Sequence, residues 1–507
     1  MTASFLLSLF LWAFPSSPPP GEEPLPNIIF FLADDLGYGE VGAYGQQKIE
    51  TPNMDALAKN GMLFTQHYSG APVCAPARCV FLTGKHLGHA YIRGNDEMPE
   101  RGDVWDYEKA CLDPNLEGQR PLPAGTVTIG SLLKEAGYTT GLFGKWGLGG
   151  PETEGIPNLQ GFDYFYGYNC QRQAHNLYPV HLWENGEKDT LDNELVPSGA
   201  KLDPLADPRD ETSYTLFRQK EYAPEKIHEK ALAFLEENKD RPFFMFYASP
   251  LPHLPLQAPK ESVDRYRAAF GEEEPYTGNR GYFPNRYPRA TYAAMISYLD
   301  QQLGELIATL QELGIYENTI ILFSSDNGPT YTGGVDFNYF KSSGPFSNGY
   351  GRTKGFVYEG GIRVPMVASW PGHIQAGTTS DHISAFYDLM PTFCDIARIE
   401  APQETDGISF LPALLGQPQR EHDFLFWDFP EYGGQQAVRM GRWKAVRKNI
   451  KDGNLELELY DLDADPLEEK DMALRYSKVV QKIEKIMKQE HTPPAVEAFK
   501  MSALGDE

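Results

Sequence analysis

A short stretch at residues 74–84 holds the best candidate for a reactive side chain. It reads Cys-Ala-Pro-Ala-Arg-Cys-Val-Phe-Leu-Thr-Gly, which puts Cys74 four residues before Arg78. A cation close to a cysteine stabilises the thiolate, so this pair could form an activated nucleophile. A cysteine in an apolar segment can also be an inert buried thiol, and these two residues alone leave both interpretations open.

Two pairs of oxygen-bearing side chains could hold a metal ion. Asp34 and Asp35 follow one apolar run, and Asp326 and Asn327 follow another. Carboxylate and amide oxygens, without histidine or thiolate, suit calcium or magnesium better than zinc. Such pairs also cap helices and form turns, and a turn-forming Gly-Pro pair follows Asn327. Taken alone, each pair leaves both interpretations open.

A lysine and a histidine follow two further apolar runs. Lys145 comes directly after one run, and His253 lies shortly after the other. A lone lysine is usually solvated, but a lysine at the end of a buried strand is a poor candidate for that. The pKa of histidine lies near neutrality, which suits general acid catalysis; a histidine satisfied within the core is the alternative.

Four apolar runs must position these side chains. They are residues 27–32, 138–143, 243–247 and 319–323. Runs that are apolar at every position predict strands buried on both faces, as in a parallel sheet flanked by helices. In such sheets ligands bind beyond the carboxyl ends of the strands. We therefore expect an α/β fold whose large, mainly parallel sheet gathers these polar residues at one edge.

Helices are expected between the strands. Apolar residues from Tyr292 to Leu310 follow the helical period, and Gly314 is placed to end that helix. Shorter helices are expected at residues 52–59 and 128–136. These apolar stripes are typical of a core and do not indicate a cofactor site.

The pattern changes after about residue 400. Short strand candidates there are split by glycines and charged residues: 424–427, 437–440, 443–446 and 455–460. They predict a small antiparallel sheet, and residues 477–489 predict a terminal helix. We therefore expect a catalytic domain at 23–400 and a C-terminal antiparallel-sheet subdomain at 401–507.

Composition limits the partners of this 507-residue chain. Its 45 Lys and Arg residues stand against 70 Asp and Glu, a formal net charge of -25. This balance argues against nucleic acid, whose phosphates require a basic surface. An anionic substrate would be repelled on average, so an anion site must be a local cluster of cations or a metal.

The N-terminus suggests export. An apolar run from Phe5 to Phe14 is too short to span a bilayer but suits the core of a signal peptide, and prolines follow it. We expect residues 1–22 to be a signal peptide and Pro-rich segment, which implies a secreted or periplasmic protein without a transmembrane span. Five cysteines leave disulfide bonds possible, but their pairing cannot be predicted.

The segment 74–84 resembles the signature of type I (formylglycine-dependent) sulfatases, which belong to the alkaline phosphatase-like superfamily. Residues 359–365 and 458–462 resemble further segments of that family, so the resemblance covers about residues 26–475. The chain is similar to secreted bacterial arylsulfatase-type polysaccharide sulfatases. It implies that a formylglycine-generating maturation enzyme oxidises Cys74 to formylglycine (3-oxoalanine), guided by Pro76 and Arg78. Ala77 stands where many relatives have serine.

The resemblance also implies roles for the other polar residues. Asp34, Asp35, Asp326 and Asn327 match the family's calcium ligands, with magnesium less favoured, and the residue at position 74 joins that coordination sphere. Arg78, Lys145 and Lys354 match the positions that surround the sulfate group. His253 matches the proton donor to the leaving oxygen.

One position departs from the family pattern. Relatives typically read Gly-Lys-Trp-His-Leu-Gly where this chain has Gly147 in place of the histidine. That histidine serves as the base, and glycine can neither bond nor transfer a proton. We hypothesise that His175 supplies the missing imidazole, with His181 as the second candidate.

The sequence says least about the substrate. Aromatic residues surround Arg172, His175 and His181, an arrangement that suits a sugar with a second anionic group but also an ordinary core. Arg172, His181 and Arg352 are the candidate substrate contacts. We favour sulfate esters of a sulfated glycan or oligosaccharide. The alternatives are a phosphate or phosphonate ester hydrolase of the same superfamily, and a non-catalytic glycan-binding relative.

Overall fold

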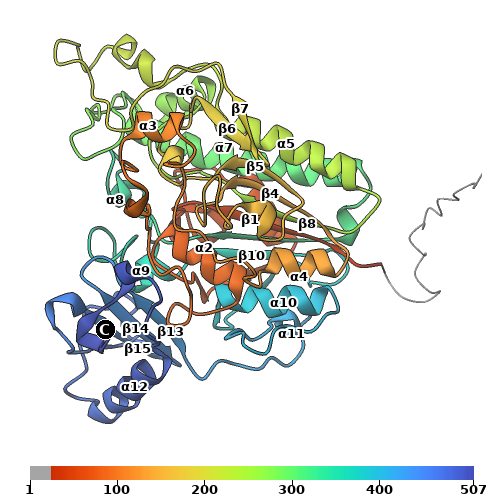
Figure 1. Cartoon of the computed structure of the whole chain (residues 1–507), viewed down its shortest axis with the longest axis vertical. Helices are drawn as coiled ribbons and strands as arrows, with labels where there is room; N and C mark the ends of the chain where they lie inside the picture. The colour runs from red at the N-terminus through yellow and green to blue at the C-terminus, as the bar shows by residue number, and fades with distance from the viewer. Residues whose placement is uncertain (1–23) are drawn as a thin grey trace, which may run out of the picture.

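The computed structural model describes residues 24–507 and is built around one large sheet (Figure 1). The expected signal peptide at residues 1–22 lies outside the described residues. The sheet has ten strands in the order β11-β2-β10-β9-β1-β8-β4-β5-β6-β7. Within residues 24–507, no helix combines the length and the apolar character that a membrane span requires.

The four predicted runs form the middle of this sheet, which confirms the expected parallel core. They are β9 (Thr319–Ser325), β1 (Asn27–Ala33), β8 (Phe243–Ala248) and β4 (Thr139–Lys145), adjacent in this order and all parallel. Nearly all of their residues are buried, as expected for strands covered on both faces. Toward the edges the sheet turns antiparallel at β10 and at β6 and β7, so it is mixed.

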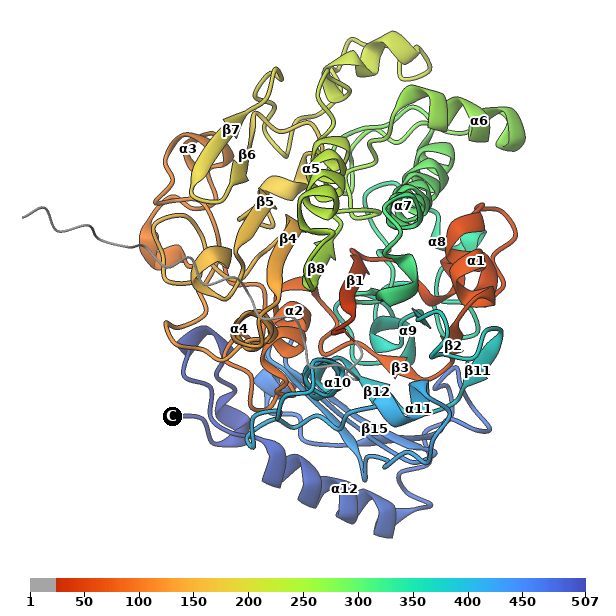
Figure 2. The same ribbon diagram turned by 90° about the vertical axis from the view of Figure 1, so that its right-hand side faces the viewer.

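Helices cover both faces of the sheet (Figure 2). The helices α5 (Ala223–Asn238) and α7 (Pro288–Glu312) lie on one face, and α4 (Ile129–Glu135) and α10 (Leu389–Ile396) lie on the other. Successive residues of β1 point alternately into two hydrophobic cores, Ile28 into one and Ile29 into the other. The helices expected at 52–59, 128–136 and 292–310 are confirmed by α1 (Pro52–Lys59), α4 and α7.

The remaining elements of this part of the chain are short. Its other strands are β2 (Met62–Phe64), β3 (His67–Tyr68), β5 (Tyr164–Tyr168), β6 (His181–Glu184), β7 (Glu187–Thr190), β10 (Met366–Ser369), β11 (Thr378–Ser380) and β12 (Ser384–Ala385). Its other α-helices are α2 (Cys74–Thr83), α3 (Tyr107–Leu112), α6 (Lys260–Phe270), α8 (Phe337–Phe340), α9 (Glu359–Ile362) and α11 (Leu411–Leu414).

A small antiparallel sheet follows, as predicted. Its strands β13 (Leu425–Phe429), β14 (Gln435–Met440), β15 (Trp443–Lys448) and β16 (Glu458–Asp461) pair in sequence order, and α12 (Ser477–Glu490) packs on them. The last strand begins three residues later than predicted. Leu455 is exposed and its carbonyl accepts a hydrogen bond from the Arg447 side chain, so it does not join the strand ladder. The division of the chain at residue 400 stays a prediction.

Candidate functional site

The carboxyl ends of the four central strands bring the predicted polar residues together. Asp34 and Asp35 follow β1, Lys145 ends β4, and His253 lies in the loop after β8. Ligand atoms of Asp34, Asp35, Cys74 and His253 all lie within 4.8 Å of one another. The site thus lies beyond the strand ends, where parallel sheets bind ligands.

Cys74 is the first residue of α2, a helix that is buried except for its last residue. Its sulfur lies 3.5 Å from the Lys145 ammonium, and the helix N-terminus favours negative charge at this position. Burial nevertheless raises the pKa of the Cys74 thiol to about 12, although Lys145 and Lys354 act in the opposite direction. The unmodified side chain is therefore a protonated thiol near neutral pH, which argues against an activated thiolate.

The oxygen donors of the site fit a bound cation. Asp34 Oδ1 and Asn327 Oδ1 are buried and have no hydrogen-bond partner among the described residues. The other carboxylate oxygens have partners: Asp35 Oδ1 accepts from the Asn327 amide at 2.7 Å, and Asp326 Oδ1 accepts from the Asp35 N–H at 3.1 Å. A buried oxygen without a partner is costly, and a hard cation would satisfy both orphaned atoms.

The three carboxylates differ in their electrostatic environment. Burial raises the pKa of Asp326 to about 7, with the negative charge of Asp34 adding to the shift and Arg78 opposing it. Burial also raises the pKa of Asp35 against the effect of Lys354. At Asp34 burial acts in the same direction, but Lys145 and other cations outweigh it and lower the pKa. Crowded buried carboxylates of this kind are typical of a metal site without its metal.

Three cations surround the carboxylates and position 74. The Lys145 ammonium lies 2.6 Å from Asp34 Oδ2, and the Lys354 ammonium lies 2.7 Å from Asp35 Oδ2. The Arg78 guanidinium contacts Asp34 and Asp326 and donates to the Lys145 carbonyl. These contacts hold three cations against three carboxylates, so the charges of the cluster balance, and a bound metal cation would make it attract a small anion.

Two histidines stack at the site. The rings of His175 and His253 lie 4.9 Å apart at an interplanar angle of 9°, and Tyr282 packs edge-on against both. Burial lowers the pKa of both histidines well below the usual value; Lys354 and Lys145 lower it further at His253, and the neighbouring His253 ring and Lys145 lower it further at His175. Both rings are therefore neutral when no anion is bound.

The structure explains why position 147 carries no histidine. Gly147 has a φ of +83°, a left-handed conformation that side chains rarely adopt, and a Cβ there would lie 2.7 Å from the Gln171 side chain. Gln171 fills this space and its amide lies 3.5 Å from Asn95 Oδ1. Sequence reasoning missed Gln171, Asn95 and Tyr282, because they lie in irregular loops outside any recognisable motif.

The three predicted substrate contacts have their partners outside this cluster. Arg172 lies 3.9 Å from Glu97 and over the exposed Trp105 ring. His181 Nε2 bonds Glu117 at 3.1 Å. The Arg352 guanidinium stacks over Tyr358 and donates to the Glu468 carbonyl. His181 and Arg352 thus have structural partners, whereas Arg172 keeps two buried nitrogens without a hydrogen-bond partner in the described part of the chain.

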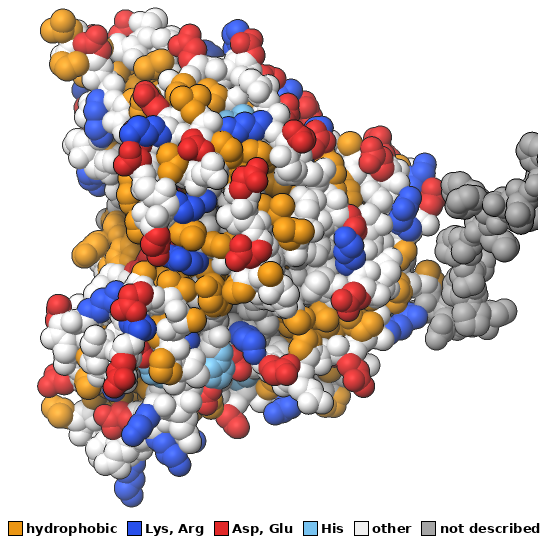
Figure 3. Space-filling model, in the orientation of Figure 1, with side chains coloured by type: hydrophobic (Ala, Val, Ile, Leu, Met, Phe, Trp, Pro, Cys, Tyr) orange, Lys and Arg blue, Asp and Glu red, His pale blue; other side chains and the backbone are white. Residues whose placement is uncertain are grey.

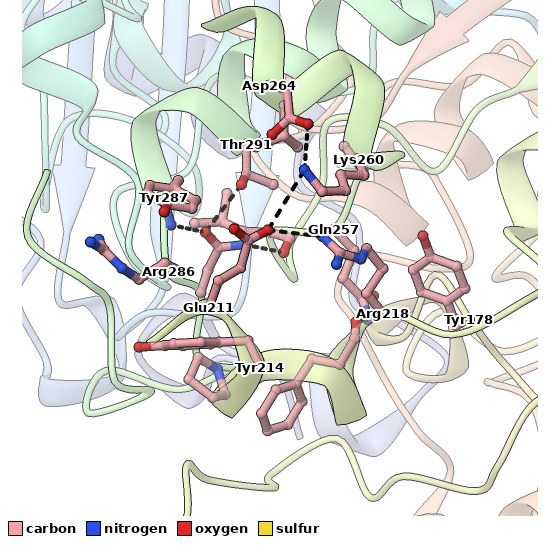
Figure 4. Close-up of a pocket in the computed structure, with 16 residues that line it drawn as sticks. Tyr178, Glu211, Tyr214, Arg218, Gln257, Lys260, Asp264, Arg286, Tyr287 and Thr291 are labelled. Atoms are coloured by element: carbon pink, nitrogen blue, oxygen red, sulfur yellow. Dashed lines mark hydrogen bonds and ion pairs between the residues drawn. The ribbon is translucent and has the colours of Figure 1, made fainter. Parts of the chain in front are cut away.

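A separate cavity lies beside α6 and the N-terminus of α7 (Figure 4). Four of its charged side chains are paired with one another: Lys260 lies close to Asp264, and Arg218 lies 3.7 Å from Glu211, whereas Arg286 pairs with Glu272 outside the lining. It contains none of the predicted catalytic or metal residues. We attribute these ion pairs to the packing of the loops around α6.

The chain matches two family models. The model described as Sulfatase matches residues 26–399, and the model described as N-sulphoglucosamine sulphohydrolase, C-terminal, matches residues 350–493. The chain is 33% identical to arylsulfatase A of Homo sapiens over 438 residues, which cover 83% of this chain and 74% of the relative. It is 30% identical to N-acetylgalactosamine-6-sulfatase of Canis lupus familiaris, covering 83% of this chain and 71% of the relative.

Solved structures agree with these matches. The crystal structure of Ps i-CgsB superposes with a TM-score of 0.71 at 26% identity and covers 94% of this chain and 96% of its own. The same protein has been solved in complex with k-i-k-neocarrahexaose. The chain belongs to the sulfatase family, with the alkaline phosphatase-like fold of type I sulfatases. It is a sulfuric ester hydrolase.

Proposed function

We propose that this protein hydrolyses O-sulfate groups on a sulfated glycan or oligosaccharide, with a formylglycine made from Cys74 as nucleophile and a bound calcium ion. The geometry around Cys74 is the main support. The side chain lies at a helix N-terminus, 3.5 Å from the Lys145 ammonium and within 4.8 Å of carboxylate oxygens of Asp34 and Asp35. An unmodified thiol is protonated there and would have to lose its proton to become a nucleophile. A neutral aldehyde hydrate does not need to carry a negative charge in this buried position.

Asp34, Asp35, Asp326 and Asn327 would hold the metal, together with the modified side chain at position 74. Oxygen-only donors in a buried carboxylate cluster favour calcium, with magnesium less suited. When bound, calcium would supply Lewis-acid chemistry toward the sulfate group. Arg78 and Lys145 hold the Asp34 carboxylate in place, which fixes the direction of its free oxygen.

The cations and histidines would carry the remaining steps. Lys145 and Lys354 bind the sulfate oxygens and offset the negative charge of the ester. A bound sulfate anion raises the pKa of the neighbouring histidines, because negative charge stabilises imidazolium. His253 would then donate a proton to the sugar oxygen as the sulfur–oxygen bond of the ester breaks. His175, in its neutral form, would accept the proton of the second hydroxyl group of the sulfated residue 74, so that sulfate leaves and the aldehyde is restored.

The relatives support a carbohydrate substrate. Ps i-CgsB has been solved with k-i-k-neocarrahexaose, and an N-acetylgalactosamine-6-sulfatase is among the relatives at 30% identity. Sulfate esters carry one negative charge fewer than phosphate dianions, which suits a site with one cluster of oxygen ligands. The expected signal peptide further supports a secreted or periplasmic enzyme, and conversion of Cys74 requires a formylglycine-generating enzyme in the host.

Mass spectrometry of the peptide that contains residue 74, followed by sulfate release from a panel of sulfated oligosaccharides, tests this proposal. We expect converted protein to release free sulfate and a Cys74→Ala variant to release none. Phosphate esters assayed in parallel should react far more slowly; faster phosphate release would favour the phosphatase alternative. Converted protein that binds sulfated sugars but releases no sulfate from any of them would overturn the proposal.

A further inference from the structure

The turn between β13 and β14 brings the C-terminal subdomain to the mouth of the site. Glu431 Oε1 accepts a hydrogen bond from the Asn95 N–H at 2.9 Å. The next residue, Tyr432, lies directly against Gly355, where an added Cβ would meet the tyrosine ring at 2.8 Å. Two neighbouring residues of one turn therefore contact two different loops of the large domain.

Both of these loops lead directly to the catalytic cluster. Asn95 Oδ1 accepts from the N–H of Ala75 at 3.1 Å, and Ala75 follows Cys74. Gly355 follows Lys354, whose ammonium bonds Asp35. The turn thus contacts the residue next to Lys354 on one side and is linked to the start of α2 by two hydrogen bonds through Asn95 on the other.

Tyr432 begins a row of aromatic rings that we call the aromatic row: Tyr432, Phe356, Tyr350 and Tyr331. Successive ring centroids are 5.4, 5.2 and 5.4 Å apart, and the rings meet edge-on. Tyr350 is 75% exposed and Tyr432 is 45% exposed. In the space-filling view, hydrophobic side chains gather along the left edge, between the upper part of the molecule and the C-terminal part (Figure 3).

The backbone of this turn adopts a strained conformation. Tyr432 has a φ of +50°, and Gly433 and Gly434 follow with φ values of +87° and +80°. A bulky residue in the left-handed region costs about 1–3 kcal/mol. The ring packs on Gly355 and Phe356 with its buried part, and its exposed part is open to a ligand outside the protein.

We propose that the aromatic row binds the sugar rings that flank the sulfated residue of an oligosaccharide. The inference rests on the proposed function and names an extended glycan as its substrate class. Apolar C–H faces of sugars pack on aromatic faces, and the tyrosine hydroxyl groups can bond the sugar hydroxyls. Phe356 of the row is two residues after Lys354 and Tyr432 contacts the intervening Gly355, so a chain anchored by its sulfate would extend across the row.

The test compares an oligosaccharide with a small aryl sulfate. In converted enzyme, Tyr432→Ala and Tyr350→Ala should lower kcat/KM for a sulfated oligosaccharide about tenfold, mainly through KM, as expected for a lost stacking contact. With 4-nitrophenyl sulfate the loss should stay below about threefold, since this substrate lacks flanking sugars. Tyr432→Phe should retain most of the oligosaccharide activity. Leu474→Ala removes a fully exposed apolar side chain of the same subdomain and should change neither value.

Equal losses on both substrates, or an unchanged rate on the oligosaccharide, would overturn the subsite. A binding measurement distinguishes a failure of the proposed subsite from a failure of the proposed function. In a Cys74→Ala background, calorimetry should show that the sulfated oligosaccharide binds more tightly than its sulfated monosaccharide, and that Tyr432→Ala removes most of this difference. This result would support the subsite even if no sulfate were released. Equal binding of both sugars would contradict the subsite.

Discussion

At the scale of single residues, the site keeps two imidazoles despite the departure at position 147. Gln171 and the left-handed backbone of Gly147 leave no room for a side chain there. His175 instead reaches the cluster from η5 (Gln173–His175), stacked on His253. This position is consistent with the hypothesis that His175 replaces the missing histidine.

Replacing His175 by alanine should lower kcat for sulfate release at least about tenfold, because general acid–base catalysis typically contributes more than that. His181→Ala is the matched control: His181 bonds Glu117 and lies outside the stacked pair, so kcat should change little. Steady-state kinetics on folded protein checks both, with thermal denaturation to confirm folding. An unchanged rate for the His175 variant would remove this residue from the mechanism.

At the scale of elements, the strand ends were predictable and the loops were not. Continuous apolar runs identify β1, β4, β8 and β9, and the parallel arrangement then requires that their polar neighbours meet. The edge strand β7 reads Glu-Lys-Asp-Thr and carries no apolar signal at all. The approach of His175 to His253, and of the β13–β14 turn to Lys354, depends on long loops whose paths no local pattern specifies.

The loops after β1 and β9 should be stabilised by calcium. Because the metal binds the folded state, calcium at a hundred times its dissociation constant adds about 2.7 kcal/mol to the free energy of unfolding. Thermal denaturation with and without a chelator should therefore show a rise in Tm on adding calcium, larger than with zinc. Asp326→Asn should reduce this rise, while Asp103→Asn, a surface control whose side chain is 68% exposed, should keep it. A calcium response that survives in the Asp326 variant would contradict this ligand assignment.

At the scale of the whole molecule, buried charge networks fasten the C-terminal subdomain to the large domain. Lys444 of β15 lies 2.9 Å from Glu359 of α9, with both side chains fully buried. Near α12, His491 bridges two carboxylates of the same subdomain, Asp428 at 2.7 Å and Asp506 at 2.9 Å, and Asp428 in turn pairs with Arg93 of the large domain at 3.1 Å. Sequence reasoning predicted the subdomain but not these links, because their partners are separated by 15 or more residues.

The His491 bridge should make stability depend on pH. Burial lowers the pKa of this histidine, but the hydrogen bonds and charges of Asp428 and Asp506 outweigh burial and raise it, while Arg93 also faces Asp428. A raised pKa in the folded state means that the stabilisation is complete below about pH 6.5, the unfolded value, and is lost as pH rises through the folded pKa.

Replacing His491 by glutamine should therefore lower the free energy of unfolding at pH 6 by about 1.5–3 kcal/mol, the range for hydrogen bonds to charged groups, and by less at pH 9. Thermal denaturation of both proteins at the two pH values measures the difference. His373→Gln is the control, since His373 is exposed and packs on Trp370. If the His491 variant lost the same Tm at both pH values, the bridge would be held by neutral hydrogen bonds, and the attachment of the subdomain would not respond to pH through this residue.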